Sequence, residues 1–329
     1  MSLLILLCVL LSLTVFFEVS GAKDGHCNTE PIVGVFTQPS SSDQGNCGGD
    51  CLYLAASYVK FIEGAGARVV PINYYASEEE LSKLFESLNG FLFVGGGSAY
   101  PPSAQYIFDK TVEANDKGDF SPLLGVCMGF QWTMLAATNN KIQLDPHDGT
   151  QMDAENISLP LDFTGTETES RMFKNAPEKI MKILSEQNVT MNNHHYGIFT
   201  STFEDTPMLS DFYNNLSTNK DRQGTEFIST VEAFKYPIYA TQWHPEKNIY
   251  EWQKVNGIPY EAINHSPDAV LISQYVADFF VHETRKSNHH FEDPATEQAS
   301  LIWNYPAVAT SGGFVQQYFF DKDFKSFNA

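Results

Sequence analysis

Short, continuously apolar segments alternate with helical patterns in the first half of this chain, and this alternation constrains its fold most. Four such segments, residues 32–36, 67–72, 91–94 and 123–126, are rich in Val, Ile, Leu and Phe at successive positions. A strand that is apolar on both faces is buried on both sides, as in a parallel sheet covered by helices. The sequence therefore predicts an α/β protein, a three-layer sandwich around a mostly parallel central sheet.

The segments between these strands carry helical patterns. Ser77 and Glu80 have the spacing of a capping box and predict a helix to about residue 88. Asp268 is the expected N-cap of the last helix. The other expected helices and strands are helices 52–63, 103–117, 128–137 and 269–286 and strands 227–234 and 237–243.

Residues 138–225 show less regular patterns, and the segment beyond Ser287 is irregular and rich in aromatic residues. Its aromatic side chains are expected to pack back onto the body: Trp303, Tyr305, Phe314, Tyr318, Phe319 and Phe320. No linker rich in Pro or Gly divides the chain. We therefore expect one domain over residues 23–329.

The chain opens with an apolar run over residues 3–17. Ser20 and Ala22 follow at the −3 and −1 positions of a signal-peptidase site, so residues 1–22 are predicted to be a signal peptide. Because no Lys or Arg precedes the run, a signal anchor is the alternative. No second apolar span of membrane length follows, and no membrane anchor is expected after cleavage.

Three glycosylation sequons support entry into the secretory pathway. They begin at Asn156, Asn188 and Asn215, which are the expected glycan sites. A fourth, at Asn264, is followed by Pro267, which impairs glycosylation.

The cysteines are Cys8, Cys27, Cys47, Cys51 and Cys127. Cys8 leaves with the signal peptide. If Cys127 is a nucleophile it stays a free thiol, and the other three then form at most one disulfide. The sequence leaves open which pair bridges.

The formal net charge is −20, from 40 acidic and 20 basic residues. This excess repels phosphate backbones and disfavours nucleic acid as a partner. It suits an acidic compartment, where carboxylates begin to protonate. A solvated surface that keeps the chain soluble is an equally good interpretation.

The pentapeptide Gly125-Val126-Cys127-Met128-Gly129 lies where a predicted strand meets a predicted helix. A nucleophile on such a sharp turn needs small neighbours, and the N-terminus of the following helix stabilises a thiolate. The N–H of Met128 is placed to donate to a developing oxyanion. The pattern predicts a nucleophilic Cys127; a buried structural cysteine is the alternative.

The segment Gln242-Trp243-His244-Pro245-Glu246 ends another predicted strand. Ligand sites of open parallel sheets lie outside the carboxyl ends of the strands, where both Cys127 and His244 fall. His244 is the expected base, which takes the thiol proton and later protonates the leaving amine. Glu246 is the expected third member of a triad. Alone, a histidine after an apolar strand is more often structural.

Gly95-Gly96-Gly97 follows the predicted strand 91–94. Glycines let backbone N–H groups approach a ligand, so this loop is a candidate for the second oxyanion donor. An ordinary strand–helix loop is the alternative. The glycine spacing of a dinucleotide site is absent, as are a P-loop and the H-E-x-x-H motif.

Asn193-His194-His195-Tyr196 contains adjacent histidines, which point to opposite faces if they lie on a strand. One of them can then enter the site. Metal binding needs further ligands at suitable spacing, and none is present in the pattern. Packing or surface exposure is the default interpretation of both.

Together, the elbow, the glycine loop and the Trp-His-Pro-Glu segment resemble the class I glutamine amidotransferases, whose fold is flavodoxin-like, and within them the gamma-glutamyl hydrolase family. The resemblance runs from about Pro31 to about Phe320. It is carried by segments specific to that hydrolase family: Ala55-Ala56-Ser57-Tyr58-Val59-Lys60, Gly66-Ala67-Arg68-Val69-Val70-Pro71, Ser170-Arg171-Met172-Phe173, Glu226-Phe227-Ile228-Ser229-Thr230, Gln242-Trp243-His244-Pro245-Glu246-Lys247 and Asn288-His289-His290-Phe291.

The resemblance implies a Cys127 nucleophile, a His244 base oriented by Glu246, and His195 near the substrate. It implies a secreted and lysosomal homodimer without metal or organic cofactor. Its substrates would be poly-gamma-glutamyl folates and antifolates, cleaved through an acyl-thioester. The triple glycine is one longer than the usual pair in this loop, so Gly96 and Gly97 are both candidate donors.

A polyanionic substrate needs local cations on a chain of charge −20. Arg171 is the preferred candidate for a bidentate carboxylate clamp, and a structural ion pair is its equal alternative. Lys60 and Lys247 are the other candidates.

Two further functions stay open. A glutaminase-type amidotransferase would need a synthetase partner that accepts ammonia, and this chain contains none. A non-catalytic secreted binding protein on the same fold is disfavoured because Cys127, His244 and Glu246 are all present.

Overall fold

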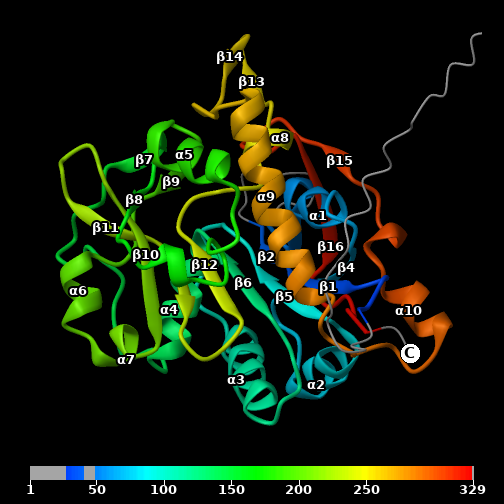
Figure 1. The fold of residues 1–329 in the computed structure, drawn as a ribbon. Coiled ribbons are helices and arrows are strands. Elements are labelled where there is room, and N and C mark those ends of the chain that lie inside the picture. The colour runs from blue at the N-terminus through cyan, green and yellow to red at the C-terminus, as the bar shows by residue number, and fades with distance from the viewer. Residues whose placement is uncertain (1–26, 41–48, 328–329) are drawn as a thin grey trace, which may run out of the picture.

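The computed structural model describes residues 27–40 and 49–327 (Figure 1). Its central sheet has eight strands in the order β4-β1-β5-β6-β12-β11-β10-β8. The first five in this order run parallel: β4 (Arg68–Ile72), β1 (Ile32–Phe36), β5 (Gly90–Phe93), β6 (Leu123–Val126) and β12 (Ile238–Thr241). The last three join by antiparallel pairing: β11 (Glu226–Ala233), β10 (Tyr213–Lys220) and β8 (Asp162–Phe163). The predicted mostly parallel sheet is confirmed.

One face of this sheet is covered by α9 (Pro267–Thr284). Leu92 of β5 and Tyr239 of β12 both pair with Leu124 of β6, so the three side chains point to the same face. On that face, Phe279 of α9 packs edge-on against Tyr239 with 4.9 Å between ring centroids.

The opposite face is covered by α4 (Met128–Ala137) and its neighbours. Phe93 of β5 points to this face, and Trp132 of α4 packs edge-on against it at 5.8 Å. Next to α4 lies α3 (Pro102–Asp116), and next to α3 lies α2 (Glu78–Ser87). The sheet therefore has helices on both faces, as the three-layer prediction requires (Figure 1).

The predicted helix over residues 52–63 was partly wrong. Cys51–Ala55 forms strand β3, and only Ala56–Glu63 forms helix α1. β3 lies in a second sheet, where it pairs antiparallel with β16 (Gln316–Asp321). Local periodicity does not reveal a strand whose partner comes from the other end of the chain. The remaining strands of this sheet are β2 (Gln38–Pro39) and β15 (Val308–Ala309).

The aromatic tail packs back onto the body through this second sheet. Phe320 of β16 is buried, and Tyr305 packs edge-on against it at 4.7 Å. Trp303 does not follow the prediction, because it is 57% exposed and its indole N–H donates to the Glu63 carboxylate at the surface.

Residues 138–225 contain more regular structure than their sequence indicated. The elements are β7 (Ala154–Leu159), α5 (Glu178–Glu186), β9 (Thr190–His194), α6 (Thr200–Glu204), α7 (Pro207–Ser210) and the strands β8 and β10. β10 has irregular register between Asn215 and Thr218. Such a bulge interrupts the alternation by which a strand is recognised.

The helix ends show why two similar N-cap predictions differed in outcome. The Ser77 hydroxyl accepts a hydrogen bond from the Glu80 N–H at 3.3 Å, as predicted. Asp268 is not the N-cap of α9, because the Ser266 hydroxyl caps that helix and Pro267 occupies its first position. Proline suits this position since it lacks an N–H that would need a partner.

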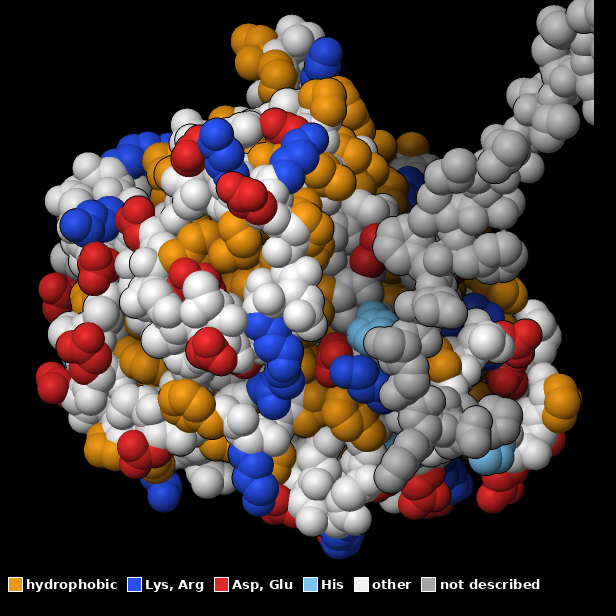
Figure 2. All heavy atoms as spheres, in the orientation of Figure 1, with side chains coloured by type: hydrophobic (Ala, Val, Ile, Leu, Met, Phe, Trp, Pro, Cys, Tyr) orange, Lys and Arg blue, Asp and Glu red, His pale blue; other side chains and the backbone are white. Residues whose placement is uncertain are grey.

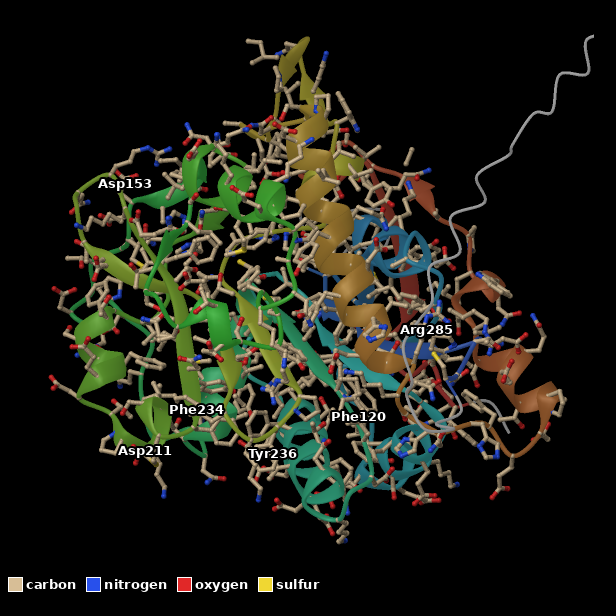
Figure 3. All side chains as sticks on the ribbon, in the orientation of Figure 1. Phe120, Asp153, Asp211, Phe234, Tyr236 and Arg285 are labelled. Atoms are coloured by element: carbon tan, nitrogen blue, oxygen red, sulfur yellow. The ribbon has the colours of Figure 1, made fainter. Side chains whose placement is uncertain are left out.

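Arg285 ends α9 and holds the N-terminal segment (Figure 3). Its guanidinium donates to the carbonyls of Asn28 and Thr29, both at 3.1 Å, and of Gly66 at 2.9 Å. These bonds fasten the segment before β1 and the turn before β4 to the same helix end.

A short hairpin, β13 (Lys254–Val255) and β14 (Ile258–Pro259), projects from the body beyond one end of α9 (Figures 1 and 2). Asn256 and Gly257 form its turn, both with positive φ, as a two-residue hairpin turn requires. Its apolar side chains stay exposed, Ile258 to 70%.

The cysteines fit the expectation of at most one disulfide. Cys51 is disulfide-bonded, whereas Cys27 and Cys127 carry free thiols. The predicted signal peptide, residues 1–22, and Cys47 lie outside the described residues. Within residues 27–40 and 49–327, no helix has the length and apolar character to cross a membrane.

Candidate active site

Cys127 lies at the junction between β6 and α4, where the sequence predicts an elbow. Its φ is +54°, in the left-handed region that side chains other than glycine rarely adopt. Its N–H donates to the Thr241 carbonyl of the neighbouring strand at 2.8 Å. Strained backbone of this kind clusters at functional sites, and here it presents the sulfur at the carboxyl ends of β6 and β12.

The two glycines of the elbow allow α4 to approach the sheet closely. A Cβ on Gly129 would lie 2.0 Å from the Phe93 carbonyl oxygen of β5. A Cβ on Gly125 would lie 2.5 Å from the Gly129 oxygen. Both neighbours are backbone atoms that cannot turn away, so the G-x-C-x-G pattern is a packing requirement.

Gly95 brings the predicted site residues around one point. A Cβ here would lie 2.8 Å from Cε1 of His244, 3.3 Å from Cβ of Cys127 and 2.5 Å from the Tyr58 hydroxyl. The glycine loop therefore belongs to the site, and Cys127 and His244 meet there although they are far apart in sequence.

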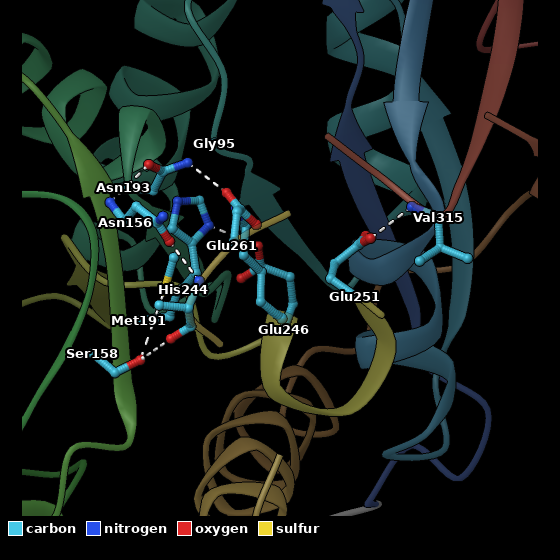
Figure 4. Close-up of polar contacts among 12 residues, drawn as sticks. Gly95, Asn156, Ser158, Met191, Asn193, His244, Glu246, Glu251, Glu261 and Val315 are labelled. Carbon is cyan, nitrogen blue, oxygen red and sulfur yellow. Dashed lines mark hydrogen bonds and ion pairs between the residues drawn. The ribbon is translucent and has the colours of Figure 1, made fainter. Parts of the chain in front are cut away.

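His244 and Glu246 form a buried pair (Figure 4). Nδ1 of His244 lies 2.7 Å from Oε1 of Glu246, so the N–H at Nδ1 donates to the carboxylate and Nε2 is left for the cysteine. The His244 N–H donates to the Met191 carbonyl at 2.8 Å, which fixes the backbone of the histidine.

The charges at the site raise the pKa of His244 to about 10. Burial alone would lower this pKa, but the negative charges of Cys127 and Glu246 outweigh it. His244 therefore carries a proton on its ring at neutral pH.

Comparisons with known proteins agree with this arrangement of Cys127, His244 and Glu246. The model of the class-I glutamine amidotransferase family matches residues 52–255. "Gamma-glutamyl hydrolase B" of Dictyostelium discoideum is 43% identical over 290 residues, which are 86% of this chain and 80% of that relative. The "gamma-glutamyl hydrolase" of Mus musculus is 41% identical over 90% of this chain and 91% of its own, and that of Homo sapiens 38% identical over 90% and 92%.

This chain belongs to the gamma-glutamyl hydrolase family. The predicted resemblance is thus confirmed, together with the class I glutamine amidotransferase fold. Among solved structures, a putative GMP synthase component from Thermoplasma acidophilum is similar to 78% of this chain and 93% of its own, at 16% identity. Its TM-score of 0.37 is too low to support the fold assignment.

The candidate active-site cavity of this family member, which Cys127 and His244 line, has a volume of about 230 Å³. Its lining residues come from β3, the elbow, the glycine loop, β9 and the segments after β12 and before β16: Tyr53, Gly95, Gly96, Gly97, Cys127, Asn193, His244, Lys247, Tyr260, Glu261, Gly313 and Phe314. The Gly95 N–H already donates to the Tyr58 hydroxyl at 2.8 Å, so it is not free to donate to an oxyanion. Gly96 and Gly97 stay as the candidate oxyanion donors of this loop, beside Met128.

Arg171, the preferred carboxylate clamp, does not lie in the active-site cavity of the hydrolase. Its guanidinium donates to the Ala233 carbonyl, lies 3.8 Å from the Glu232 carboxylate and stacks over the Tyr239 ring. It lines a different cavity, beside α9. This expectation of the sequence is corrected: Arg171 is a structural ion pair.

His195 is likewise absent from the residues that line the cavity. Its ring is partly exposed, and Nε2 lies 3.5 Å from the Glu155 carboxylate. β9 ends at His194, so strand alternation no longer fixes the direction of the next side chain. Asn193 is the residue of this segment that lines the cavity.

His194 is a buried neutral base beside the site. Burial, and then the charge of His244, lower its pKa to about 3. Its Nδ1 donates to the Tyr196 carbonyl at 3.0 Å, and its ring packs edge-on against Phe227. A histidine in the unfolded chain has a pKa near 6.5. Below that pH, His194 is protonated in the unfolded chain but stays neutral in the folded one.

We therefore expect His194 to make the fold less stable as pH falls from about 6.5 toward 3. At pH 4.5 the loss is roughly 2–3 kcal/mol. His194→Asn retains a donor near Nδ1 but does not titrate, and should reduce the difference in unfolding free energy between pH 7 and pH 4.5 by about that amount. Urea denaturation at both pH values measures it, and an unchanged difference would show that His194 is protonated in the fold.

Tyr58, Asn193 and Glu261 contribute to the site but were not assigned to it from the sequence. The Tyr58 hydroxyl lies 3.4 Å from Nδ1 of His244, and burial, followed by the charges of Glu246 and Cys127, raises its pKa well above the usual value, so it stays neutral. Tyr58 lies in one of the segments typical of the family, but the segment indicates no role for it. Asn193 belongs to the segment with the two adjacent histidines, in which only the histidines were considered, and Glu261 lies in no motif. The fold brings both to the cavity.

Proposed function

We propose that this chain hydrolyses gamma-glutamyl isopeptide bonds of poly-gamma-glutamyl folates and antifolates, with Cys127 as nucleophile. One observation carries the proposal: in a member of the gamma-glutamyl hydrolase family, Cys127 and His244 meet around Gly95 in one cavity, and His244 is hydrogen-bonded to Glu246. Neither cofactor nor metal enters the proposed reaction.

Acylation begins when the Cys127 thiolate attacks the γ-carbonyl carbon of a glutamyl residue. The carbonyl electron pair moves to oxygen, where the N–H of Met128 at the start of α4 and that of Gly96 or Gly97 donate to it. The tetrahedral intermediate collapses, the C–N bond breaks, and the imidazolium of His244 gives its proton to the leaving nitrogen. A γ-glutamyl thioester on Cys127 and a free amine result.

Deacylation uses the same groups in the reverse roles. Neutral His244 takes a proton from water as its oxygen attacks the thioester carbon. The C–S bond breaks, which restores the thiolate beside the imidazolium and releases the γ-carboxylic acid, whose remaining proton passes to solvent. Glu246 keeps the ring in one orientation and stabilises its charge in both steps.

The remaining expectations are part of the proposal. Residues 1–22 are a signal peptide, and residues 23–329 form one domain that is secreted or delivered to lysosomes. Asn156 and Asn188 are exposed and Asn215 is partly exposed, as acceptors of glycans are. The homodimer follows from the family resemblance alone.

The products formed from a folate pentaglutamate test the proposed function. The purified chain should release glutamate or short γ-linked glutamate peptides and shorten the tail, without producing ammonia. It should leave an α-linked pentaglutamate intact, which controls for general peptidase activity. Ammonia release from glutamine without cleavage of γ-glutamyl bonds would instead indicate the amidotransferase alternative, and no turnover of either would favour the binding protein.

A further inference from the structure

We propose that Lys247 and Glu261 bind the α-carbon substituents of the glutamyl residue that Cys127 attacks, Lys247 its α-carboxylate and Glu261 its α N–H group. The inference rests on the proposed function, because it names the part of the substrate that the same site recognises. It makes this ion pair the determinant of specificity for the acyl side of the bond.

The ion pair is unusual in its position. Nζ of Lys247 lies 2.6 Å and 2.7 Å from the two oxygens of Glu261, and both side chains are buried although they line the cavity that holds Cys127. Removing two charges from water is costly, and apolar residues often replace such a pair without loss of stability. A ligand that needs both charges explains why the pair lies here.

Each partner keeps one unused hydrogen-bonding position. The Lys247 ammonium has three N–H groups, and its two hydrogen bonds go to Glu261. The Glu261 carboxylate has about four acceptor positions, of which Lys247 uses two and the Nδ2 group of Asn193 a third. The Phe314 ring, which also lines the cavity, lies 5.8 Å from Nζ of Lys247. Within the described residues no other hydrogen bond to either group is found, which leaves one donor and one acceptor for a ligand.

The unit is held in place by its surroundings (Figure 4). Asn193 bridges Glu261 and the backbone N–H of Asn156, which its Oδ1 accepts at 3.0 Å. Oδ1 of Asn156 accepts the N–H of Ala262, and the Ser158 hydroxyl donates to the Ala262 carbonyl at 3.0 Å. The segment that carries Glu261 is therefore fixed to β7 before any ligand enters, which lowers the entropic cost of binding.

The cavity matches one glutamyl residue. Its volume of about 230 Å³ is smaller than the pockets that enclose drug-sized ligands, so it encloses one residue of the substrate and not the whole folate. In a γ-linked chain that residue offers one carboxylate and one N–H on its α-carbon. Lys247 is the one Lys or Arg among the lining residues within the described parts of the chain.

Two matched substrate analogues test the assignment. Both derive from N-acetyl-γ-glutamyl-glutamate: one has a carboxamide in place of the acyl-side α-carboxylate, the other in place of the leaving-side α-carboxylate. Wild-type kcat/KM should fall roughly 100-fold for the acyl-side analogue, as expected when a buried cation loses its partner. The leaving-side analogue should lose much less.

The variants separate recognition from folding. Lys247→Met alone leaves Glu261 charged and buried, so the decisive variant combines Lys247→Met with Glu261→Gln and carries neither charge. In this double variant, kcat/KM for the parent and for the acyl-side analogue should differ by less than about threefold. Its kcat/KM for the acyl-side analogue should be about that of wild type. The single variant Lys247→Arg keeps a positive charge and should keep most of the preference for the parent over the acyl-side analogue. Lys60→Met is the matched control, because Lys60 bonds to Gln316 outside the cavity lining and should leave the ratio unchanged.

Three results would overturn the assignment. One is a double variant that discriminates against the acyl-side analogue as wild type does. Another is an equal fall of kcat/KM for all three substrates, which marks a structural pair. The third is a wild-type kcat/KM that falls more for the leaving-side analogue than for the acyl-side analogue. If wild type does not cleave even the parent substrate, the proposed function fails as well. If wild type cleaves the parent but shows one of these three results, only the assignment of Lys247 and Glu261 fails.

Discussion

Cys127→Ala should abolish hydrolysis and leave the fold intact. The thiolate is the nucleophile in the proposed mechanism, and no other residue of the cavity replaces it. kcat/KM should fall by about 10⁵-fold or more, as for removal of the nucleophile of a triad. The substitution removes only one sulfur atom from a buried side chain and should change stability little. Initial rates on a folate polyglutamate, with thermal unfolding of the same preparation, measure both effects.

Cys27→Ala is the matched control for this prediction. Cys27 also carries a free thiol, but it is exposed and lies outside the cavity. Its replacement should leave the rate unchanged. Turnover near the wild-type rate in the purified Cys127→Ala protein would remove Cys127 from the mechanism, and the binding-protein alternative would gain if neither form were active.

His244→Ala should be nearly as damaging, whereas Glu246→Ala should cost less. The histidine protonates the leaving group and then activates water, so its loss should lower kcat/KM by about 10⁵-fold or more. The carboxylate orients the ring through one hydrogen bond of 2.7 Å, and its loss should cost about 10⁴-fold. Steady-state kinetics of both variants check the order, and equal losses would give Glu246 a direct part in the chemistry.

The pH profile of Glu246→Ala separates an orienting role from a structural one. Burial lowers the pKa of His244, while the charges of Cys127 and Glu246 raise it, to about 10 in the intact site. Without the Glu246 charge this pKa falls, so the imidazolium is lost at lower pH. The alkaline decline of kcat/KM should therefore shift to lower pH in the variant. A decline at the same pH as in wild type would contradict the charge coupling between the two residues.

The features predicted well from the sequence depend on short segments. Apolar runs indicate the parallel strands, and the spacing around Cys127 indicates an elbow whose φ of +54° and close glycine contacts the structure shows. The placing of His244 beside it follows from a general rule for parallel sheets, that sites gather at the carboxyl ends of strands.

The features predicted poorly depend on contacts between distant segments. The local pattern at β3 favours a helix, because its strand partner β16 lies near the end of the chain. Residue type favours Arg171 over Lys247 as the carboxylate-binding cation, but the fold places Arg171 against Tyr239 and Lys247 in the cavity. A cation's residue type shows what it can bind, and only the tertiary structure shows whether it lies within reach of the substrate.

The central claim is that hydrolysis passes through a γ-glutamyl thioester on Cys127. Rapid quenching in acid during turnover of a folate pentaglutamate, followed by intact-protein mass measurement and peptide mapping, tests it most directly. The account predicts an added γ-glutamyl-containing acyl group on the peptide with Cys127, absent from Cys127→Ala and retained in Cys27→Ala. The control is an enzyme with a known acyl-thioester, from which the same procedure recovers the acyl group. If that control succeeds and full turnover leaves no acyl group on the Cys127 peptide at any quench time, the claim is contradicted.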